Sequence, residues 1–331
     1  MEATNYLLMT IGFNIYIIVG TNKLRYHWDT TKVGMMKINY KPCRKKDLIP
    51  AFKMVRSSMN HLRKSTGKEP LRYRVRRYPE VTHLYNHDKK RFWCAWDGKK
   101  IIGFTGALLR GKQWYLAFLF VHPRYQDKGV GKELLKRVWM DAPGLTHSLS
   151  TFAYNVQAVG IYSKFGMAPL CALPIMEIKL DKVQRPVPSG LKVSTTITRQ
   201  DIAWINQLEA KIRGYSRPQE WRFWSKQDEI QIYLFRDKGQ RVGYSMAHKK
   251  WGVIAPAGAV TNGYLTQIVA DTIGLIKTPE KSIRLYCPTN NIVLYRYLIG
   301  MGFRILEMDL FLSDKPYADF QCYLPAHLAI F

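Results

Sequence analysis

The chain has 331 residues, about twice the length of a usual domain, so we expect two domains, each with its own core. Hydrophobic residues make up 47% of the sequence and aromatic residues 13%, which argues against a disordered chain. With 51 Lys and Arg against 24 Asp and Glu, the formal net charge is +27. Such a chain favours anionic partners: phosphorylated cofactors, nucleic acid, acidic proteins or anionic lipid.

The cysteines are odd in number and scattered, and no two form a Cys-x-x-Cys pair, so neither a disulfide framework nor a zinc site is indicated. A cytoplasmic location is therefore expected. Residues 6–20 form a mostly apolar stretch without a charge, but they fall short of the roughly 20 apolar residues that a membrane-spanning helix needs. We expect residues 1–34 to be an accessory extension of unknown role, with a membrane role or an upstream start of the reading frame as alternatives.

The first elements are predicted by hydrophobic periodicity. Residues 36–40 alternate as a half-buried strand does, and a helical pattern runs from Lys46 to near Gly67. A basic segment follows, before a polar loop expected around His83 and His87. The segment consists of Arg72, Tyr73, Arg74, Arg76, Arg77 and Tyr78. It could stack on bases or rings, although a solvated basic surface is the simpler interpretation.

Three consecutive strands are then expected, over residues 91–96, 101–109 and 114–121, because turn residues separate three apolar runs. A helix over residues 133–140, a strand over 146–153, a helix capped by Asn155 and a strand over 176–180 complete the first half. Two prolines and a glycine mark a linker over residues 182–190, so the predicted domains are 35–181 and 191–331.

The second half repeats this order of elements without clear sequence identity. Its predicted strands cover residues 191–198, 231–235, 241–248 and 282–286, and its predicted helices cover 201–213, 269–276 and 291–299.

The turn between the third of those strands and the next helix is suited to phosphate. Its residues are Gln126, Asp127, Lys128, Gly129, Val130, Gly131 and Lys132. The first amides of a helix have no partner inside the helix and lie at the positive end of its dipole, and glycine lets an anion approach the backbone closely.

Residues 121–131 resemble the motif Val-x-Pro-x-x-Gln-x-x-Gly-x-Gly of the GNAT acetyltransferase superfamily, and every motif position is filled. The resemblance implies that the amides from Gln126 to Lys132 hold the pyrophosphate of acetyl-CoA. It also implies that the backbone of Phe120 and Val121 contacts the acetyl and pantetheine portion. Lys128 and Lys132 would add positive charge.

A second motif of the same superfamily is matched by Asn155, Ala158, Tyr162, Gly166 and Met167. The resemblance implies that Asn155 contacts the cofactor and that Tyr162 lies near its sulfur, where the hydroxyl would protonate the departing thiolate. A core aromatic without a catalytic role is the alternative for Tyr162.

An amine needs a base before it can attack a thioester, and the strand over residues 114–121 contains no carboxylate. Glu177, Glu80 and His83 are the substitutes, and none of the three is preferred. His83 and His87 have a spacing seen in metal sites, but Leu84 stands where a zinc protease has glutamate, so no metal is expected.

The second half follows the second motif through Asn291, Leu294, Leu298, Gly302 and Phe303, with Leu298 in the place of Tyr162. No matching glycine turn occurs over residues 260–278, so this half is expected to be degenerate.

The resemblance thus implies an α/β fold of two GNAT-like mixed-sheet domains in tandem, each a mostly antiparallel central sheet flanked by helices. The expected function is acetyl-CoA-dependent N-acetyl transfer to an unidentified amine, by direct attack without an acyl-enzyme. A nucleic-acid-associated GNAT-fold binding protein and a non-catalytic acyl-CoA sensor are the alternatives.

Overall fold

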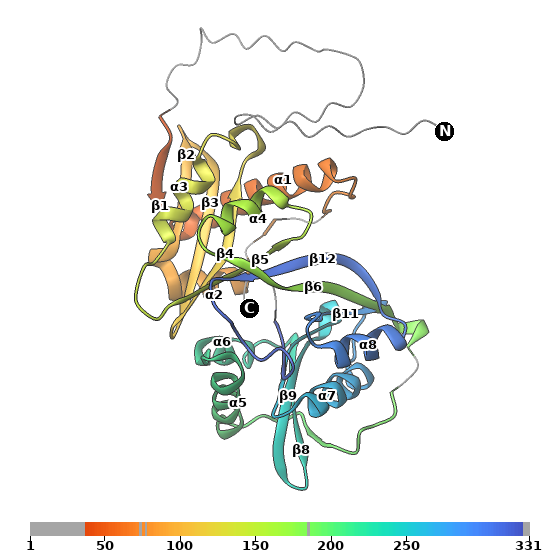
Figure 1. The fold of residues 1–331 in the computed structure, drawn as a ribbon. Coiled ribbons are helices and arrows are strands. Elements are labelled where there is room, and N and C mark those ends of the chain that lie inside the picture. The colour runs from red at the N-terminus through yellow and green to blue at the C-terminus, as the bar shows by residue number, and fades with distance from the viewer. Residues whose placement is uncertain (1–36, 73–74, 77, 184–185, 327–331) are drawn as a thin grey trace, which may run out of the picture. The chain divides into compact units, whose positions relative to one another are not determined.

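The computed structural model describes residues 37–72, 75–76, 78–183 and 186–326, and the described residues from Ile38 onward form one compact unit (Figure 1). The expected extension over residues 1–34 lies outside the described part. Within that part, no helix is both long enough and apolar enough to cross a membrane.

Apart from α2, the first half follows the order of helices and strands expected from the sequence. Its elements are β1 (Asn39–Pro42), α1 (Leu48–Ser65), α2 (Pro79–Asp88), β2 (Phe92–Asp97), β3 (Lys100–Arg110), β4 (Gln113–Val121), α3 (Val130–Val138), β5 (Thr146–Phe152), α4 (Val156–Ser163) and β6 (Ala168–Lys179).

The second half repeats the order. Its elements are β7 (Lys192–Ser194), α5 (Arg199–Arg213), α6 (Pro218–Trp224), β8 (Ile230–Asp237), β9 (Gln240–His248), β10 (Val253–Ala259), α7 (Asn262–Leu275), β11 (Ser282–Tyr286), α8 (Ile292–Gly300), β12 (Arg304–Ser313) and β13 (Tyr323–Leu324).

Local sequence explains several helix ends. The Thr198 hydroxyl accepts a hydrogen bond from the Asp201 amide while the Asp201 carboxylate accepts from the Thr198 amide, so a capping box begins α5. Gly214 follows α5 with φ of 79°, a left-handed conformation that glycine adopts without a steric penalty.

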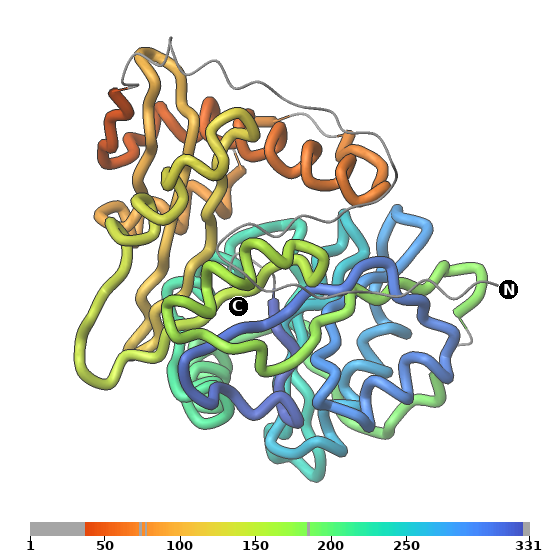
Figure 2. Tube along the Cα trace, turned by 45° about the horizontal axis from the view of Figure 1, so that its top comes forward, coloured from red at the N-terminus to blue at the C-terminus, as the bar shows by residue number. Residues whose placement is uncertain are grey.

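The strands form a single sheet that runs through both halves in the order β1-β2-β3-β4-β5-β12-β6-β11-β10-β9-β8-β7, with β13 beside β10. Only β4–β5 and β10–β11 pair in parallel, so the predicted mostly antiparallel sheet flanked by helices is confirmed. β6 of the first half and β12 of the second half each lie beside strands of the other half. β12 pairs with both β5 and β6, and β6 also pairs with β11 (Figures 1 and 2).

Helices cover both sides of this sheet. One apolar cluster joins the two halves on the side of α1, α2, α5 and α6, which we call the α1 face. On the opposite side, α3 and α4 cover the strands of the first half, and we call that side the α3 face. A further cluster packs α7 and α8 against β10 and β11. The α1 face is therefore the side on which the two halves share a core.

The prediction of a polar loop around His83 and His87 is wrong, because both residues lie in the helix α2. Pro79 occupies the first turn, where a missing N–H has no cost, and Leu84 and Tyr85 bury the inner side of the helix. Strand β10 was not predicted because it contains Pro256. The proline is tolerated because the pairing with β9 is irregular between Ile254 and Ala257.

Candidate active site

The parallel strands β4 and β5 pair along only part of their length. Pairing runs from Gln113 with Thr146 to Leu116 with Leu149, although β4 continues to Val121 and β5 to Phe152. The register between β3 and β4 also shifts at this point, leaving Ala117 as an extra residue of β4. Beyond Leu116, β4 therefore has no pairing partner on β5. The sheet is open there to a ligand with hydrogen-bonding groups.

The glycine turn lies directly after this open end of β4. The Gln126 side-chain amide donates to the Val121 carbonyl at 3.1 Å, which ties the turn to the strand. Asp127 and Gly129 have φ of 60° and 78°, so the chain turns sharply into α3. The Glu133 amide is the first of α3 to bond back along the chain, to the Gly129 carbonyl at 3.0 Å, so the amides just before it have no partner within the helix. Unpaired amides at a helix N-terminus, next to a glycine turn, are suited to hold an anion.

Side chains around the turn are mostly exposed. The Lys128 ammonium lies 5.5 Å from the centroid of the Tyr125 ring, and Lys132 is exposed in the first turn of α3. The Asp127 carboxylate accepts a hydrogen bond from the Gln157 side chain at 2.5 Å. The turn is thereby joined to α4, the helix that carries the second motif.

Asn155 lies directly before α4, and Tyr162 lies near the end of the helix. The Asn155 side chain accepts from the Ala158 amide at 3.3 Å and so caps the helix. Tyr162 is 7% exposed and packs in the cluster that contains Leu116 and Leu149, the pair at which β4 and β5 part. Burial raises the pKa of Tyr162, so the phenol keeps its proton at neutral pH. In a reaction it could therefore serve as a proton donor but not as a base.

The three candidate bases lie in other surroundings. Glu177 of β6 forms an ion pair with Arg284 at 2.7 Å and accepts from Ser282 at 2.8 Å. Burial tends to raise the pKa of Glu177, but these two contacts lower it overall, which makes the carboxylate a weaker base. Glu80 lies half-buried in the first turn of α2.

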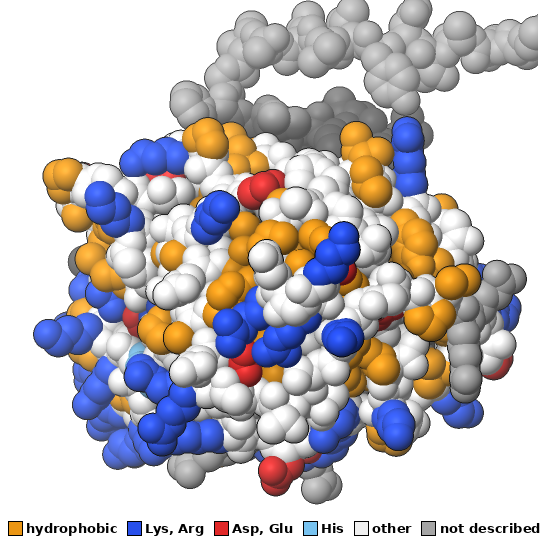
Figure 3. All heavy atoms as spheres, turned by 90° about the horizontal axis from the view of Figure 1, so that it is seen from below, with side chains coloured by type: hydrophobic (Ala, Val, Ile, Leu, Met, Phe, Trp, Pro, Cys, Tyr) orange, Lys and Arg blue, Asp and Glu red, His pale blue; other side chains and the backbone are white. Residues whose placement is uncertain are grey.

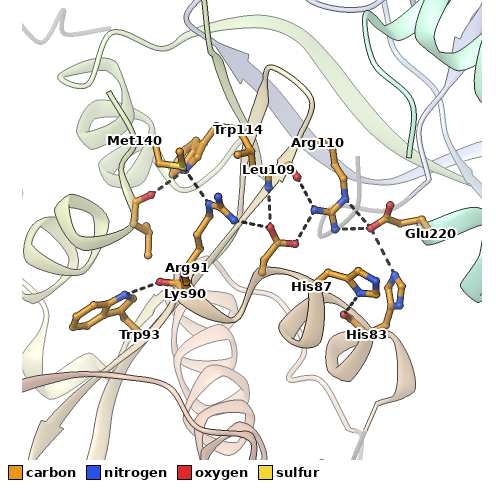
Figure 4. A network of polar contacts seen from close by, with 12 residues as sticks. His83, His87, Lys90, Arg91, Trp93, Leu109, Arg110, Trp114, Met140 and Glu220 are labelled. Carbon is orange, nitrogen blue, oxygen red and sulfur yellow. Dashed lines mark hydrogen bonds and ion pairs between the residues drawn. The ribbon is translucent and has the colours of Figure 1, made fainter. Parts of the chain in front are cut away.

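His83 faces the second half of the chain. Its ring stacks on Phe223 with centroids 4.4 Å apart, and its Nε2 lies 3.7 Å from Oε1 of Glu220 (Figure 4). In the described residues, neither His83 nor Glu177 forms a hydrogen bond or ion pair with the turn or with Tyr162.

The second half has a helix cap that corresponds to Asn155, but it lacks the glycine turn. Asn291 caps α8 by accepting from the Leu294 amide at 3.1 Å, as Asn155 caps α4. The Asn291 side chain also donates to the carbonyl oxygens of Phe320 and Gln321, at 2.9 and 3.1 Å. Only two residues, 260 and 261, connect β10 to α7.

The fold and this site define a class of protein. Residues 58–167 match the family model described as the acetyltransferase (GNAT) family. The chain therefore carries a GNAT domain, and the GNAT superfamily assignment made from the two sequence motifs is confirmed. Acetyl transfer in general is the activity of this family.

Solved structures share the fold over most of the chain. A predicted acetyltransferase from Pyrococcus horikoshii aligns with a TM-score of 0.67 at 14% identity, covering 92% of this chain and 100% of the other. A GCN5-related N-acetyltransferase from Sphaerobacter thermophilus aligns with 0.58 at 17% identity, covering 86% and 98%. A tandem GNAT protein of the clavulanic acid biosynthesis pathway aligns with 0.55 at 13% identity, covering 85% and 99%. A search of curated protein sequences found no match.

The basic segment is only partly described. Arg72 and Arg76 are exposed, while Tyr73, Arg74 and Arg77 lie outside the described residues. Figure 3 shows a face on which Lys and Arg side chains are spread among apolar and uncharged atoms. The positive charge is thus dispersed over this face rather than confined to one motif.

Proposed function

We propose that the first half of the chain binds acetyl-CoA and transfers its acetyl group to an amine. The observation that carries this proposal is the position of the glycine turn. It directly follows the end of β4 that is not paired with β5, and it leads into the N-terminus of α3. A pyrophosphate on the amides of residues 127–132 would leave the pantetheine arm to extend between the two strands. Tyr162, protonated and packed against Leu116 and Leu149, would then donate its proton to the leaving thiolate.

The division of labour between the halves is part of the same proposal. Residues 35–181 would hold acetyl-CoA and the proton donor Tyr162, and residues 191–331 would form a degenerate domain without a cofactor site of its own, because β10 enters α7 without a glycine turn. The family match supports acetyl transfer over a purely nucleic-acid-binding role.

Titration calorimetry with acetyl-CoA tests the proposal. We expect saturable binding by the full chain, and weaker binding by the double variant Lys128→Ala, Lys132→Ala. The double variant Lys249→Ala, Lys250→Ala removes the same charge at a different turn and should bind as the wild type does. Absence of binding by the wild type would overturn the proposal.

The acceptor is sought by measuring thiol release from acetyl-CoA with four amines: spermidine, kanamycin, lysine and a peptide with a free N-terminus. Release stimulated by any of the four shows an amine acceptor. Binding of acetyl-CoA without release would instead favour the acyl-CoA sensor.

A further inference from the structure

Asp309 of β12 is an isolated carboxylate in the shared core. It is 0% exposed, and neither of its carboxylate oxygens has a hydrogen-bond partner among the described residues. Buried carboxylates in proteins are normally paired or hydrogen-bonded, because burial without a partner is costly. A buried and unpartnered carboxylate is therefore a candidate for a group that meets its partner only when a substrate binds.

Glu307 provides the comparison on the same strand. It lies two residues before Asp309 and so on the same face of β12. Arg63 and Lys68 neutralise it, with N–O distances of 3.3 and 3.4 Å. Among the described residues, Glu307 thus forms ion pairs with two cations, whereas Asp309 forms none.

The register of β12 places Asp309 level with the open part of the sheet, with β5 between β12 and that opening. Asp309 pairs with Phe152 of β5, three residues beyond Leu149, the last residue that β5 pairs with β4. Phe311, two residues further along β12, belongs to the cluster on the α1 face. Asp309 therefore lies on the α1 face, whereas Tyr162 and the glycine turn belong to the α3 face. A cofactor that enters from the α3 face would present its thioester between β4 and β5 to a group on the α1 face.

Three tyrosines lie near the carboxylate. Asp309 lies close enough to Tyr115, Tyr154 and Tyr286 that its charge contributes to raising their pKa values, in addition to their burial. Phe152 stacks on Tyr154 with ring centroids 5.1 Å apart. The Tyr154 hydroxyl is buried without a hydrogen bond of normal geometry in the described part. Aromatic rings around one carboxylate are the groups that recognise an alkylammonium ion.

We infer that Asp309 binds the ammonium group of the acceptor and is the general base of the transfer, contributed by the second half of the chain to the site of the first. This inference rests on the function proposed above. It extends that function by assigning the acceptor to the α1 face and by identifying it as a primary alkylamine.

The proposed reaction balances as follows. The acceptor ammonium gives one proton to the Asp309 carboxylate, and the freed lone pair forms a C–N bond to the acetyl carbonyl carbon. The C–S bond breaks, and its electron pair remains on the sulfur of coenzyme A. The sulfur takes a proton from Tyr162, the phenolate recovers one from the acetylated nitrogen, and Asp309 releases its proton to water.

The pKa of Asp309 supports a base that works near neutral pH. Burial is the main cause and the charge of Glu307 a second one, and they raise the pKa to about 8 against the opposing charge of Lys68. The base form appears as pH rises, so kcat/KM should increase through a limb centred near pH 8.

The test measures kcat/KM for thiol release against pH, using the fastest of the four amines, or acetyl-CoA hydrolysis if no amine exceeds water. Asp309→Asn should lower kcat/KM by about 100-fold or more and remove the limb, with unchanged acetyl-CoA affinity. Glu307→Gln should retain the limb and move it to lower pH, because a like charge is removed. Lys68→Met should move it to higher pH.

These shifts also test the inference if Asp309→Asn does not fold. An Asp309→Asn rate within threefold of wild type, or a limb that neither neighbouring variant moves, would overturn the inference while leaving the proposed function intact. Failure of the wild type to bind acetyl-CoA would overturn both.

Discussion

Arg110 of β3 and Glu220 of α6 form a buried ion pair that links the two halves of the chain, with Nη2 and Oε1 2.5 Å apart (Figure 4). Arg110 also donates to Asp88 of α2 at 2.7 Å, and Asp88 accepts from Arg91 at 3.0 Å. All but Arg91 are buried. The network therefore fixes α2 and α6 on the shared α1 face.

Removing one member of the pair should be strongly destabilising. Arg110→Leu leaves the buried carboxylates of Asp88 and Glu220 without their main partner, and we expect a loss of about 3–5 kcal/mol in the free energy of unfolding. Urea denaturation measures it. Lys250→Leu, which breaks an exposed pair with Glu229, should cost less than about 1 kcal/mol. Equal losses in the two variants would contradict this account.

The same network should make stability depend on acid pH. Burial tends to raise the pKa of Glu220, but contacts with His83 and Arg110 lower it from 4.5 to about 2. Its contribution is therefore complete above pH 4.5 and is lost as pH falls towards 2. Between these limits, the unfolding free energy of the wild type should fall more steeply with acid than that of Glu220→Gln, by up to about 1.4 kcal/mol per pH unit. Parallel curves would show that Glu220 has no such role.

A glycine pair separates backbone strain from cofactor binding. Gly129 and Gly98 both have left-handed φ, 78° and 54°, and an added Cβ would meet no atom within 4 Å at either position. Alanine at each should cost a similar 1–2 kcal/mol of stability, roughly the left-handed penalty. Only Gly129→Ala should also weaken acetyl-CoA binding, which calorimetry would measure. Equal affinity in both variants would argue against the cradle.

Tyr162→Phe should reduce turnover while leaving acetyl-CoA affinity nearly unchanged, because only the proton donor is removed. The expected loss is about 10²-fold in kcat. Tyr233→Phe is the matched control, since Tyr233 is also a buried tyrosine with a raised pKa but lies in the second half. A full pH profile identical to that of the wild type would leave Tyr162 as a core aromatic.

Sequence reasoning identified the elements that carry local signals. The glycine turn, the Asn155 cap and the Thr198 end of α5 were recognisable because each depends on residues close together in the chain. The helix α2 was not predicted because most of its residues are polar and only two apolar residues, Leu84 and Tyr85, are buried against the core.

Asp309 also left a local signal, because it is the lone charge in the apolar run from Met308 to Leu312. A strand pattern shows that such a charge is unusual, but it cannot show which strands flank it. That depends on the pairing of β12 with β5 and β6, whose residues lie at least 125 positions earlier in the chain.

The sequence by itself determined the superfamily, the glycine turn and the repeat of element order, because periodicity, caps and glycine conformations act over a few residues. Only the tertiary structure decided that the two halves share one sheet and one core, and that β4 and β5 part beside a buried carboxylate from the second half. Strand order is set by burial and backbone hydrogen bonding between distant segments, and no local pattern records it.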